Sequence, residues 1–410
     1  MDRSACVSLD RADPLAPKRA AFAIPAGLIY LDGNSLGALP RHVPERIRDV
    51  VERQWGGALI RSWNEHGWLT LPRRAGDRIA RLIGAPAGSV IAGDTISANL
   101  FKLVGAAAKL APSRRVILSD DGNFPSDLYV AAGFRDLVDN GYTLEIVAPE
   151  EVMDAIDERV AFTLLTEVDY RTARRHDMRA LTARAHECGA LTIWDLAHSA
   201  GALPVDLTGA NADFAVGCTY KYLNGGPGSP AFLYVRPDLQ GSVQPAIAGG
   251  WGHARPFAFS RDYEPAPGIL RMQCGTQPII SLAALDAALD VWDDVEMGTV
   301  HAKAVGLCAL FIDLVEQRCG GHGITMPGPR DTATRGSHVS IRHPQGYAVM
   351  QALIAAGVIG DFRDPDMMRF GFAPLYTRYA DVWDAVETLT GILDSRAWDR
   401  PHFLARKAIP

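Results

Sequence analysis

Apolar runs alternate with amphipathic segments between residues 90 and 235, and this alternation predicts the main body of the fold. Short runs rich in Val, Ile, Leu and Phe are typical of buried strands, and the segments between them have helical periodicity. Strands that alternate with helices form a mostly parallel sheet covered on both faces. We therefore expect an α/β fold with strands at 90–93, 116–119, 161–165, 191–195, 213–218 and 231–235.

The pattern changes after residue 235, where helices become longer and strands fewer. A chain of 410 residues also exceeds the usual size of a single core. The later segments predict a second, α+β domain with helices at 279–292, 300–317, 346–356 and 380–393 and strands at 337–341 and 358–362. Residues 1–28 contain three prolines and little periodicity, so we expect an extended arm there. The predicted division is 1–70 for an N-terminal arm and a segment that packs on the small domain, 71–290 for the large domain, and 291–410 for the small domain.

Composition and charge exclude several classes of protein. The net charge is -6, from 41 basic and 47 acidic residues, and no basic stripe interleaved with aromatics occurs, so we expect no nucleic-acid partner. The six cysteines show neither CxxC pairs nor zinc spacing, which predicts reduced thiols, no metal and a cytoplasmic location. No run of 18 apolar residues lacks a charge, and the first residues do not resemble a signal peptide. We therefore expect no membrane partner.

Two chemically active residues follow neighbouring predicted strands. Asp195 ends the run 191–195, and Lys221 lies between the run 213–218 and the glycine-rich loop 224–229. Ligands of open α/β sheets bind at the carboxyl ends of the strands. A lysine amine condenses with the aldehyde of pyridoxal 5′-phosphate, and an aspartate keeps the pyridine nitrogen protonated, so the ring accepts electrons. The alternative is that Asp195 caps a helix and Lys221 is a solvated loop residue.

Other segments are consistent with the same cofactor, and each also has a purely structural interpretation. Hydroxyls and free amides at 94–99 open a helix, which predicts a phosphate cradle or an ordinary helix cap. Phe124 follows a predicted strand and precedes Pro125, which restricts its backbone. We expect its ring to stack on a planar cofactor ring. Arg369 lies between apolar neighbours and would either clamp a substrate carboxylate or form an internal ion pair. Dinucleotide and Walker A glycine motifs are both absent from the sequence, so a nucleotide is not expected.

Taken together, five segments resemble the motifs of the kynureninase family, in order along the chain. They are Leu-Asp-Gly-Asn-Ser-Leu-Gly at 31–37, Asn-Phe-Pro-Ser-Asp at 123–127, Trp-Asp-Leu-Ala-His-Ser-Ala-Gly at 194–201, Tyr-Lys-Tyr-Leu-Asn at 220–224 and Cys-Gly-Thr-Gln-Pro at 274–278. The resemblance covers residues 30 to 375. It implies fold type I of the pyridoxal-phosphate-dependent enzymes, with a mostly parallel seven-stranded sheet in a large domain and a smaller α+β domain. It also implies a homodimer with active sites at the interface.

The same resemblance implies a hydrolase of tryptophan catabolism that cleaves L-kynurenine, or its 3-hydroxy form, to anthranilate or 3-hydroxyanthranilate and L-alanine. By position, Lys221 carries the cofactor aldehyde, Asp195 meets the pyridine nitrogen, and Tyr220 is a candidate acid. The implied surroundings of the cofactor are Ile96, Ser97, Phe124, Pro125, Ser126, Asp127, Thr166, His198, Tyr220, Trp251 and Thr276, with Thr276 contributed by the other subunit. Arg369 matches the arginine that takes the substrate carboxylate, and Ser35 and Trp63 are implied near the aromatic end of the substrate.

One segment departs from the family pattern. The family usually shows Gly-Trp-aromatic-Gly-His, whereas this chain has Gly-Gly-Trp-Gly-His at 249–253, which leaves open whether Trp251 or its neighbour takes the indole position. Other enzymes of the same fold are the alternative, such as a cysteine desulfurase or an epimerase. A desulfurase needs a mobile cysteine after the lysine, and Cys319 is the candidate. A further alternative is a non-catalytic binding module, against which the full set of polar site residues argues.

Overall fold

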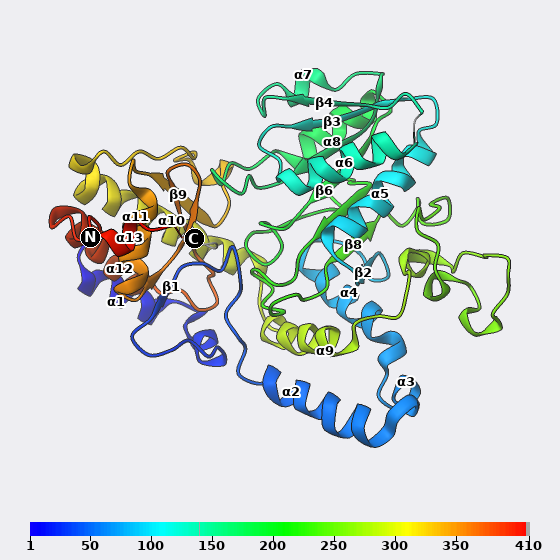
Figure 1. The fold of residues 1–410 in the computed structure, drawn as a ribbon, viewed down its shortest axis with the longest axis horizontal. Coiled ribbons are helices and arrows are strands. Elements are labelled where there is room, and N and C mark those ends of the chain that lie inside the picture. The colour runs from blue at the N-terminus through cyan, green and yellow to red at the C-terminus, as the bar shows by residue number, and fades with distance from the viewer. Residues whose placement is uncertain (139, 407–410) are drawn as a thin grey trace.

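A seven-stranded sheet forms the centre of the larger part of the molecule in the computed structural model, which describes residues 1–138 and 140–406 (Figure 1). The strand order is β2-β8-β7-β6-β5-β3-β4. β8 is antiparallel to both of its neighbours, and the other pairs are parallel. The predicted mostly parallel seven-stranded sheet is therefore confirmed, with bounds β2 Val90–Ala92, β3 Val116–Asp120, β4 Thr143–Val147, β5 Val160–Thr166, β6 Leu191–Asp195, β7 Phe214–Gly217 and β8 Phe232–Val235.

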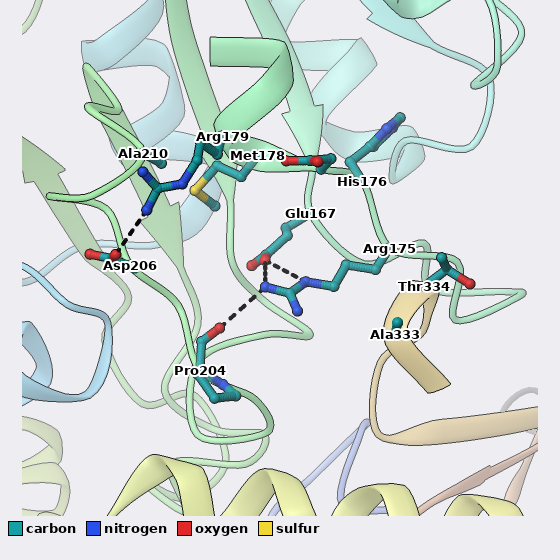
Figure 2. Close-up of a pocket in the computed structure, with 11 residues that line it drawn as sticks. Glu167, Arg175, His176, Met178, Arg179, Pro204, Asp206, Ala210, Ala333 and Thr334 are labelled. Atoms are coloured by element: carbon teal, nitrogen blue, oxygen red, sulfur yellow. Dashed lines mark hydrogen bonds and ion pairs between the residues drawn. The ribbon is translucent and has the colours of Figure 1, made fainter. Parts of the chain in front are cut away.

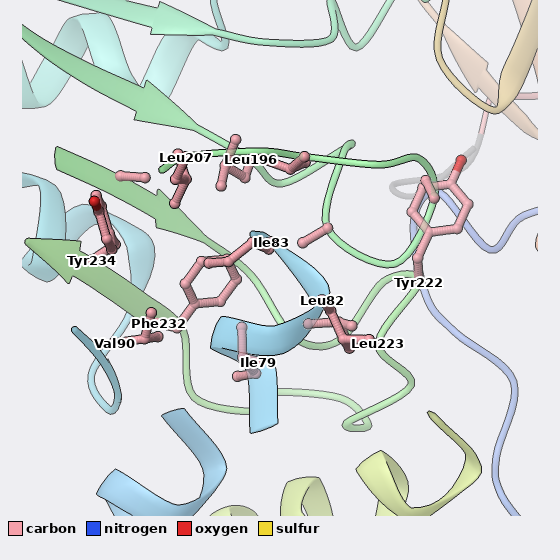
Figure 3. Packing of buried hydrophobic residues seen from close by; sticks show 14 of the residues in the cluster. Ile79, Leu82, Ile83, Val90, Leu196, Leu207, Tyr222, Leu223, Phe232 and Tyr234 are labelled. Carbon is pink, nitrogen blue, oxygen red and sulfur yellow. The ribbon is translucent and has the colours of Figure 1, made fainter. Parts of the chain in front are cut away.

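Helices cover both faces of this sheet because its strands are apolar on both sides. Ile193 of β6 packs in the cluster under α5 (Ile96–Leu110) and α6 (Pro125–Val138). Its neighbour Trp194 points the opposite way, into the cluster under α4 (Leu71–Leu82), α8 (Met178–Glu187) and α9 (Ile279–Ala288). Figure 3 shows the second cluster, in which Ile79 of α4 lies close to Phe232 of β8 and Leu82 of α4 lies close to Leu223. Both layers hold the strand ends in fixed positions.

A smaller part of the molecule is built on a second sheet of three antiparallel strands in the order β11-β12-β9. The strands are β9 (His338–Arg342), β11 (Asp361–Arg363) and β12 (Met367–Gly371), and the helices are α10 (Met297–Cys319), α11 (Gly346–Ala355) and α12 (Tyr379–Asp394). The single strand predicted at 358–362 is wrong. Its first residues form β10 (Val358–Ile359), which pairs in parallel with β1 (Ile29–Tyr30), and β11 follows after Gly360. Strand β12, which carries Arg369, was not predicted, because a central arginine interrupts its apolar pattern.

The extended arm expected at the N-terminus is also wrong. Arg3–Ala12 form helix α1, whose first turn is capped by the Asp2 carboxylate, which accepts a hydrogen bond from Ala5 N at 2.8 Å. The helix packs against α12 and buries Cys6, and the prolines follow it. Helix α2 (Val43–Asp49) continues as a π-helix over Val50–Ala58 and packs against α9. The remaining α-helices are short: α3 Ser62–Glu65, α7 Val152–Ala155 and α13 Pro401–Leu404.

Helix α10 and the turn after it, Met297–His322, are long and apolar enough to cross a membrane. However, 56% of the apolar window is buried inside the protein, against residues of β9, β12 and α12. A core helix meets the same test of length and composition, and the packing of α10 is that of a core helix.

Candidate active site

A pocket of about 400 Å³ lies where the large sheet, the loop after β1 and the small sheet meet. The carboxyl ends of β3, β5, β6 and β7 lead into it, as expected for an open α/β sheet. Arg363 and Arg369 enter it from the small sheet. Among its lining residues are twelve of those predicted from the sequence: Ser35, Ile96, Ser97, Phe124, Ser126, Asp127, Thr166, Asp195, His198, Tyr220, Lys221 and Arg369.

Two carboxyl groups share one buried corner of this pocket. Asp195 ends β6 and Asp127 lies in the first turn of α6, and the two are 2% and 1% exposed. One Asp195 oxygen accepts a hydrogen bond from Ala197 N at 2.8 Å. Burial raises the pKa of both carboxyl groups, and the Asp195 charge raises that of Asp127 further, well above its usual value. At Asp195, Lys221 and the Ala197 amide oppose the effect of burial. A proton is therefore favoured on Asp127 more than on Asp195.

The Lys221 amine points back toward this corner from the turn after β7. Its Nζ lies 2.9 Å from Nε2 of His198. Burial and the Lys221 charge lower the pKa of His198 well below its usual value, so the imidazole is neutral and its Nε2 accepts a hydrogen bond from the amine. Its Nδ1 is buried without a hydrogen-bond partner, as is Oδ2 of Asp127. Two unpartnered polar atoms beside a lysine leave hydrogen-bonding positions for a polar ligand.

The N-terminus of α5 forms another side of the pocket. Thr95 caps this helix by accepting a hydrogen bond from Ala98 N at 3.3 Å, and Ile96 and Ser97 begin it. No acidic residue lies in the first turn, so the free amides and the helix dipole face the pocket with positive potential. This arrangement suits an anionic group such as a phosphate.

An aromatic wall closes the pocket opposite the sheet. Phe124 precedes α6, is 42% exposed, and meets Tyr170 in an edge contact with ring centroids 5.0 Å apart. The loop is held by Asn123, whose side-chain oxygen accepts hydrogen bonds from Phe124 N at 2.7 Å and from the Thr166 hydroxyl at 2.5 Å. The backbone at Phe124 is therefore held in place, and its exposed ring lines the pocket.

The N-terminal loop at 31–37 closes against the lysine turn. Gly37 N donates a hydrogen bond to Tyr220 O at 2.7 Å, and a Cβ on Gly37 would lie 2.2 Å from Lys221 O. Only glycine permits this approach. Asn224 ends the turn with a positive φ of 60° and donates its side-chain amide to Ala38 O at 2.9 Å. The loop thus brings Asn34 and Ser35 into the pocket.

Arg369 forms an internal ion pair, which was the alternative to an arginine that is free to bind a substrate carboxylate. It is 1% exposed, and its Nε lies 2.7 Å from an Asp361 oxygen. The Ser35 hydroxyl donates to Asp361 at 2.6 Å and accepts from Arg369 Nη2 at 3.2 Å. Ser35 therefore lies at the arginine end of the pocket.

Four predicted residues do not line the pocket of this chain. Pro125 begins α6 beside Phe124. Trp63 and Trp251 stack on each other with ring centroids 4.8 Å apart, and the Trp251 indole N–H donates to the Thr276 hydroxyl at 3.3 Å. The three therefore form a separate group, which we call the indole cluster.

Tyr170, Arg363 and Asn34 are among the pocket residues that were missed from the sequence. Tyr170 and Arg363 had no pattern around them that distinguishes them from other surface residues. Asn34 lies in a motif that was recognised, yet only the structure shows that it is fully buried, with both amide atoms unpartnered.

A second cavity, of about 470 Å³, lies behind β5 and is shown in Figure 2. Its central carboxylate, Glu167, accepts a hydrogen bond from Arg175 Nε at 2.9 Å, and Arg175 also donates to Pro204 O at 3.2 Å. Arg179 reaches Asp206 at 3.4 Å on the far side. Its lining residues include none of the predicted site residues, and its basic groups already have acidic partners.

Comparisons with known proteins point to the same class of enzyme as the geometry of the pocket. Residues 300–389 match the family model described as the kynureninase C-terminal domain. The kynureninase of Pseudomonas fluorescens is 54% identical over 412 aligned residues and that of Burkholderia pseudomallei (strain 1106a) is 53% identical, each with 99% of both chains covered. Among solved structures, the apo cysteine desulfurase of Thermococcus onnurineus NA1 has a TM-score of 0.79 at 17% identity and covers 92% of this chain and 98% of its own.

A second solved structure, of a C-DES variant with glycine covalently linked to its pyridoxal-phosphate cofactor, has a TM-score of 0.77 at 17% identity, covering 91% of this chain and 98% of its own. The fold is thus that of the fold type I pyridoxal-phosphate-dependent enzymes, and the pocket, with a lysine, a buried acid pair and a helix N-terminus, fits that cofactor. At more than half identity over the full length of its relatives, the chain belongs to the kynureninase family.

Proposed function

We propose that this chain hydrolyses the Cβ–Cγ bond of L-kynurenine or its 3-hydroxy form, releasing anthranilate or 3-hydroxyanthranilate and L-alanine. The full-length relatives named kynureninase support this function. Within the structure, the observation that carries it is the Lys221 amine, 2.9 Å from a neutral His198 and beside the Asp195–Asp127 pair. The reaction is a step of tryptophan catabolism.

Pyridoxal 5′-phosphate would be held by residues from every side of the pocket. Lys221 would take the aldehyde, Asp195 the pyridine nitrogen, and the N-terminus of α5 the phosphate. Phe124 would stack on the ring. When bound, the cofactor supplies an electron sink that makes bonds at the substrate Cα and Cβ easier to break.

The chain's own residues would manage the protons. Asp195, whose charged form Lys221 and the Ala197 amide stabilise against the effect of burial, would hold a proton on the pyridine nitrogen. Lys221 would remove the Cα proton, and His198 Nε2 would accept a hydrogen bond from the lysine amine. Burial and the neighbouring acidic groups raise the pKa of Tyr220, which keeps its phenol protonated and able to donate a proton to Cβ.

We further propose a homodimer in which the indole cluster of one subunit completes the pocket of the other. The cluster lies outside the pocket of its own chain: Trp63 is in α3 (Ser62–Glu65), whereas Trp251 and Thr276 belong to the segment between β8 and α9. Part of that segment extends away from the large sheet (Figure 1). Large apolar residues near it in the sequence are exposed, at 77% for Ile60, 65% for Phe257 and 86% for Phe259. Exposed apolar surface of this kind favours an interface with a second copy. A single-subunit mass from light scattering would contradict the dimer.

We place the enzyme in the cytoplasm, because all six cysteines are unpaired thiols that a reducing compartment preserves. We also keep the division into 1–70, 71–290 and 291–410. The packing of α1 on α12 and the pairing of β1 with β10 support the attachment of the N-terminal arm to the small domain. The packing of α2 on α9 ties the second half of the first segment to the large domain instead.

The test is steady-state turnover of purified enzyme with pyridoxal phosphate, measured by product fluorescence with L-kynurenine and 3-hydroxy-L-kynurenine in parallel. The alternative, a cysteine desulfurase, predicts sulfide release from cysteine. Its candidate thiol, Cys319, is fully buried at the end of α10 and lies 3.5 Å from the Thr390 hydroxyl, so the structure does not favour it. Sulfide release without an aromatic product would contradict the proposed function.

A further inference from the structure

The hydrogen bonds of Arg369 limit what it can still bind. Its Nε and Nη2 hold both Asp361 oxygens, Nη2 also reaches Ser35, and Nη1 donates to Tyr170 O at 2.6 Å. Four of the five guanidinium N–H groups are thus occupied. A bidentate grip on a second carboxylate needs two parallel N–H groups. Arg369 can offer only one of them while it holds Asp361.

A second guanidinium is available in the same pocket. Arg363 lies two residues after Asp361 on β11, so both side chains leave the strand on one face. Its Nη2 lies 2.9 Å from an Asp361 oxygen, and its Nη1 donates to Phe362 O at 2.9 Å. The Arg363 side chain is 36% exposed, against 2% for Arg369. It lines the pocket, and each of its two terminal nitrogens has a further N–H beyond the one used in these contacts.

The charges at this end favour one additional anion. Asp361 is ionised, because the two arginines hold its pKa below the usual value. Burial and the Asp361 charge raise the pKa of Asp32, whose Oδ1 is buried and unpartnered, to about 7. Below that pH the cluster has two cations and one anion. The excess positive charge matches a single substrate carboxylate.

We propose that Arg363 binds the α-carboxylate of the amino-acid substrate directly, while Arg369, held by Asp361, contributes one N–H and positions both groups. This inference rests on the proposed function, because it assigns a contact to the substrate of that reaction. It makes Arg363 a determinant of affinity for the substrate and for L-alanine, the product that keeps the same carboxylate. The cofactor contacts and the proton transfers at Lys221 do not involve Arg363.

The test compares Arg363→Gln and Arg363→Lys with Arg342→Gln. Arg342 is a matched control: it lies in register with Arg363 two strands away, pairs with Asp366 at 2.8 Å, and does not line the pocket. Loss of a charged contact should raise KM for kynurenine by about tenfold to a hundredfold in Arg363→Gln, with kcat changed much less. Arg363→Lys, which keeps the charge but not the fork, should fall between. Arg342→Gln should match the unaltered enzyme.

Competitive inhibition separates carboxylate binding from a general structural effect. The unaltered enzyme should bind L-alanine more tightly than L-alaninamide, which lacks the carboxylate charge. In Arg363→Gln the inhibition constant of L-alanine should rise as KM does, and that of L-alaninamide should stay the same. A merely structural change would shift both inhibitors together and would overturn the proposal, as would an unchanged KM.

Two further measurements distinguish failure of the Arg363 proposal from failure of the proposed function. The visible absorbance of the bound cofactor should be equal in all variants, which would show that the substitutions at Arg363 leave cofactor binding intact. That function is judged by turnover of the unaltered enzyme alone. If Arg363→Gln does not fold, Arg363→Lys decides, and a normal KM together with a normal preference for L-alanine would refute the contact.

Discussion

The two ends of the pocket differ in how their polar groups are satisfied. At the lysine end, Asp127 Oδ2 and His198 Nδ1 are buried and have no partner. At the arginine end, Arg369 and Asp361 already bind each other, and Ser35 bonds to both. Unpartnered buried atoms cost free energy that a ligand can recover, whereas a paired guanidinium has little left to gain.

This difference corresponds to the two molecules that the pocket would bind. The cofactor would remain bound at the lysine end, whereas the substrate would bind at the arginine end and leave in each turnover. The lysine end is preorganised, with unsatisfied groups for a permanently held polar ring. The arginine end keeps Arg369 paired with Asp361 between turnovers, so an incoming carboxylate meets an intact framework and the partly exposed side chain of Arg363. The comparison predicts that changes at the lysine end abolish chemistry and that changes at the arginine end alter affinity and stability.

The largest effect is expected for Lys221→Ala, which removes both the cofactor attachment and the base. Turnover of kynurenine should fall by at least about a thousandfold, and the visible absorbance of the cofactor should disappear. Both are measured on purified protein after incubation with pyridoxal phosphate. A variant that keeps the absorbance and the turnover would place the chemistry elsewhere.

The acid pair should respond unequally to neutralisation. Asp195→Asn removes the charge that holds a proton on the pyridine nitrogen, and kcat should fall about a hundredfold or more. Asp127→Asn imitates the protonated carboxyl that burial already favours, and kcat should fall less than about tenfold. Equal losses in the two variants would show that the proton is not held on Asp127.

At the arginine end, Arg369→Met should lower the free energy of unfolding by about 3 kcal/mol, because it leaves Asp361 buried without its main partner. Combining it with Asp361→Asn should restore about half of that loss. Urea unfolding of the two variants measures both values. If the double variant is less stable than the single one, the pair is not the source of the effect.

The smallest predicted effect is a pH dependence of substrate affinity. Below about pH 7 Asp32 is neutral, and above it the ionised carboxylate repels the substrate carboxylate, so KM should rise by up to about tenfold per pH unit. The groups that face Asp32 are Tyr30, Ser35, Tyr222, Asp361, Arg363, Arg369 and Tyr376. Asp32→Asn should abolish the rise in initial-rate measurements, and a rise that persists would assign it to another group.

Much of the fold follows from local patterns. The run ending at Asp195 has the apolar composition of a strand covered on both faces, and it is β6 in the structure. The motif at 220–224 identifies Lys221 as the candidate cofactor lysine from the sequence alone. Helix α1 was missed because its stability comes from an Asp2 cap and from packing on α12, and the second of these is a contact between distant segments.

The arrangement within the pocket was harder to anticipate. The ion pair of Arg369 joins β12 to Asp361 of β11, and Ser35 reaches it from more than three hundred residues away. Arg363 has no distinctive neighbours in the sequence, and its role depends on which donors Arg369 has left. Such features arise from tertiary contacts, which the hydrophobic pattern does not encode.

The central claim is that the cofactor is attached to Lys221. Borohydride reduction of the coloured holoenzyme fixes the link between lysine and cofactor, and peptide mass mapping then identifies the modified residue. We expect one modified peptide from the unaltered enzyme, with the added mass on Lys221. The Lys221→Ala variant should show no visible absorbance before reduction. A modification on another lysine, or a colourless enzyme that still cleaves kynurenine, would contradict it.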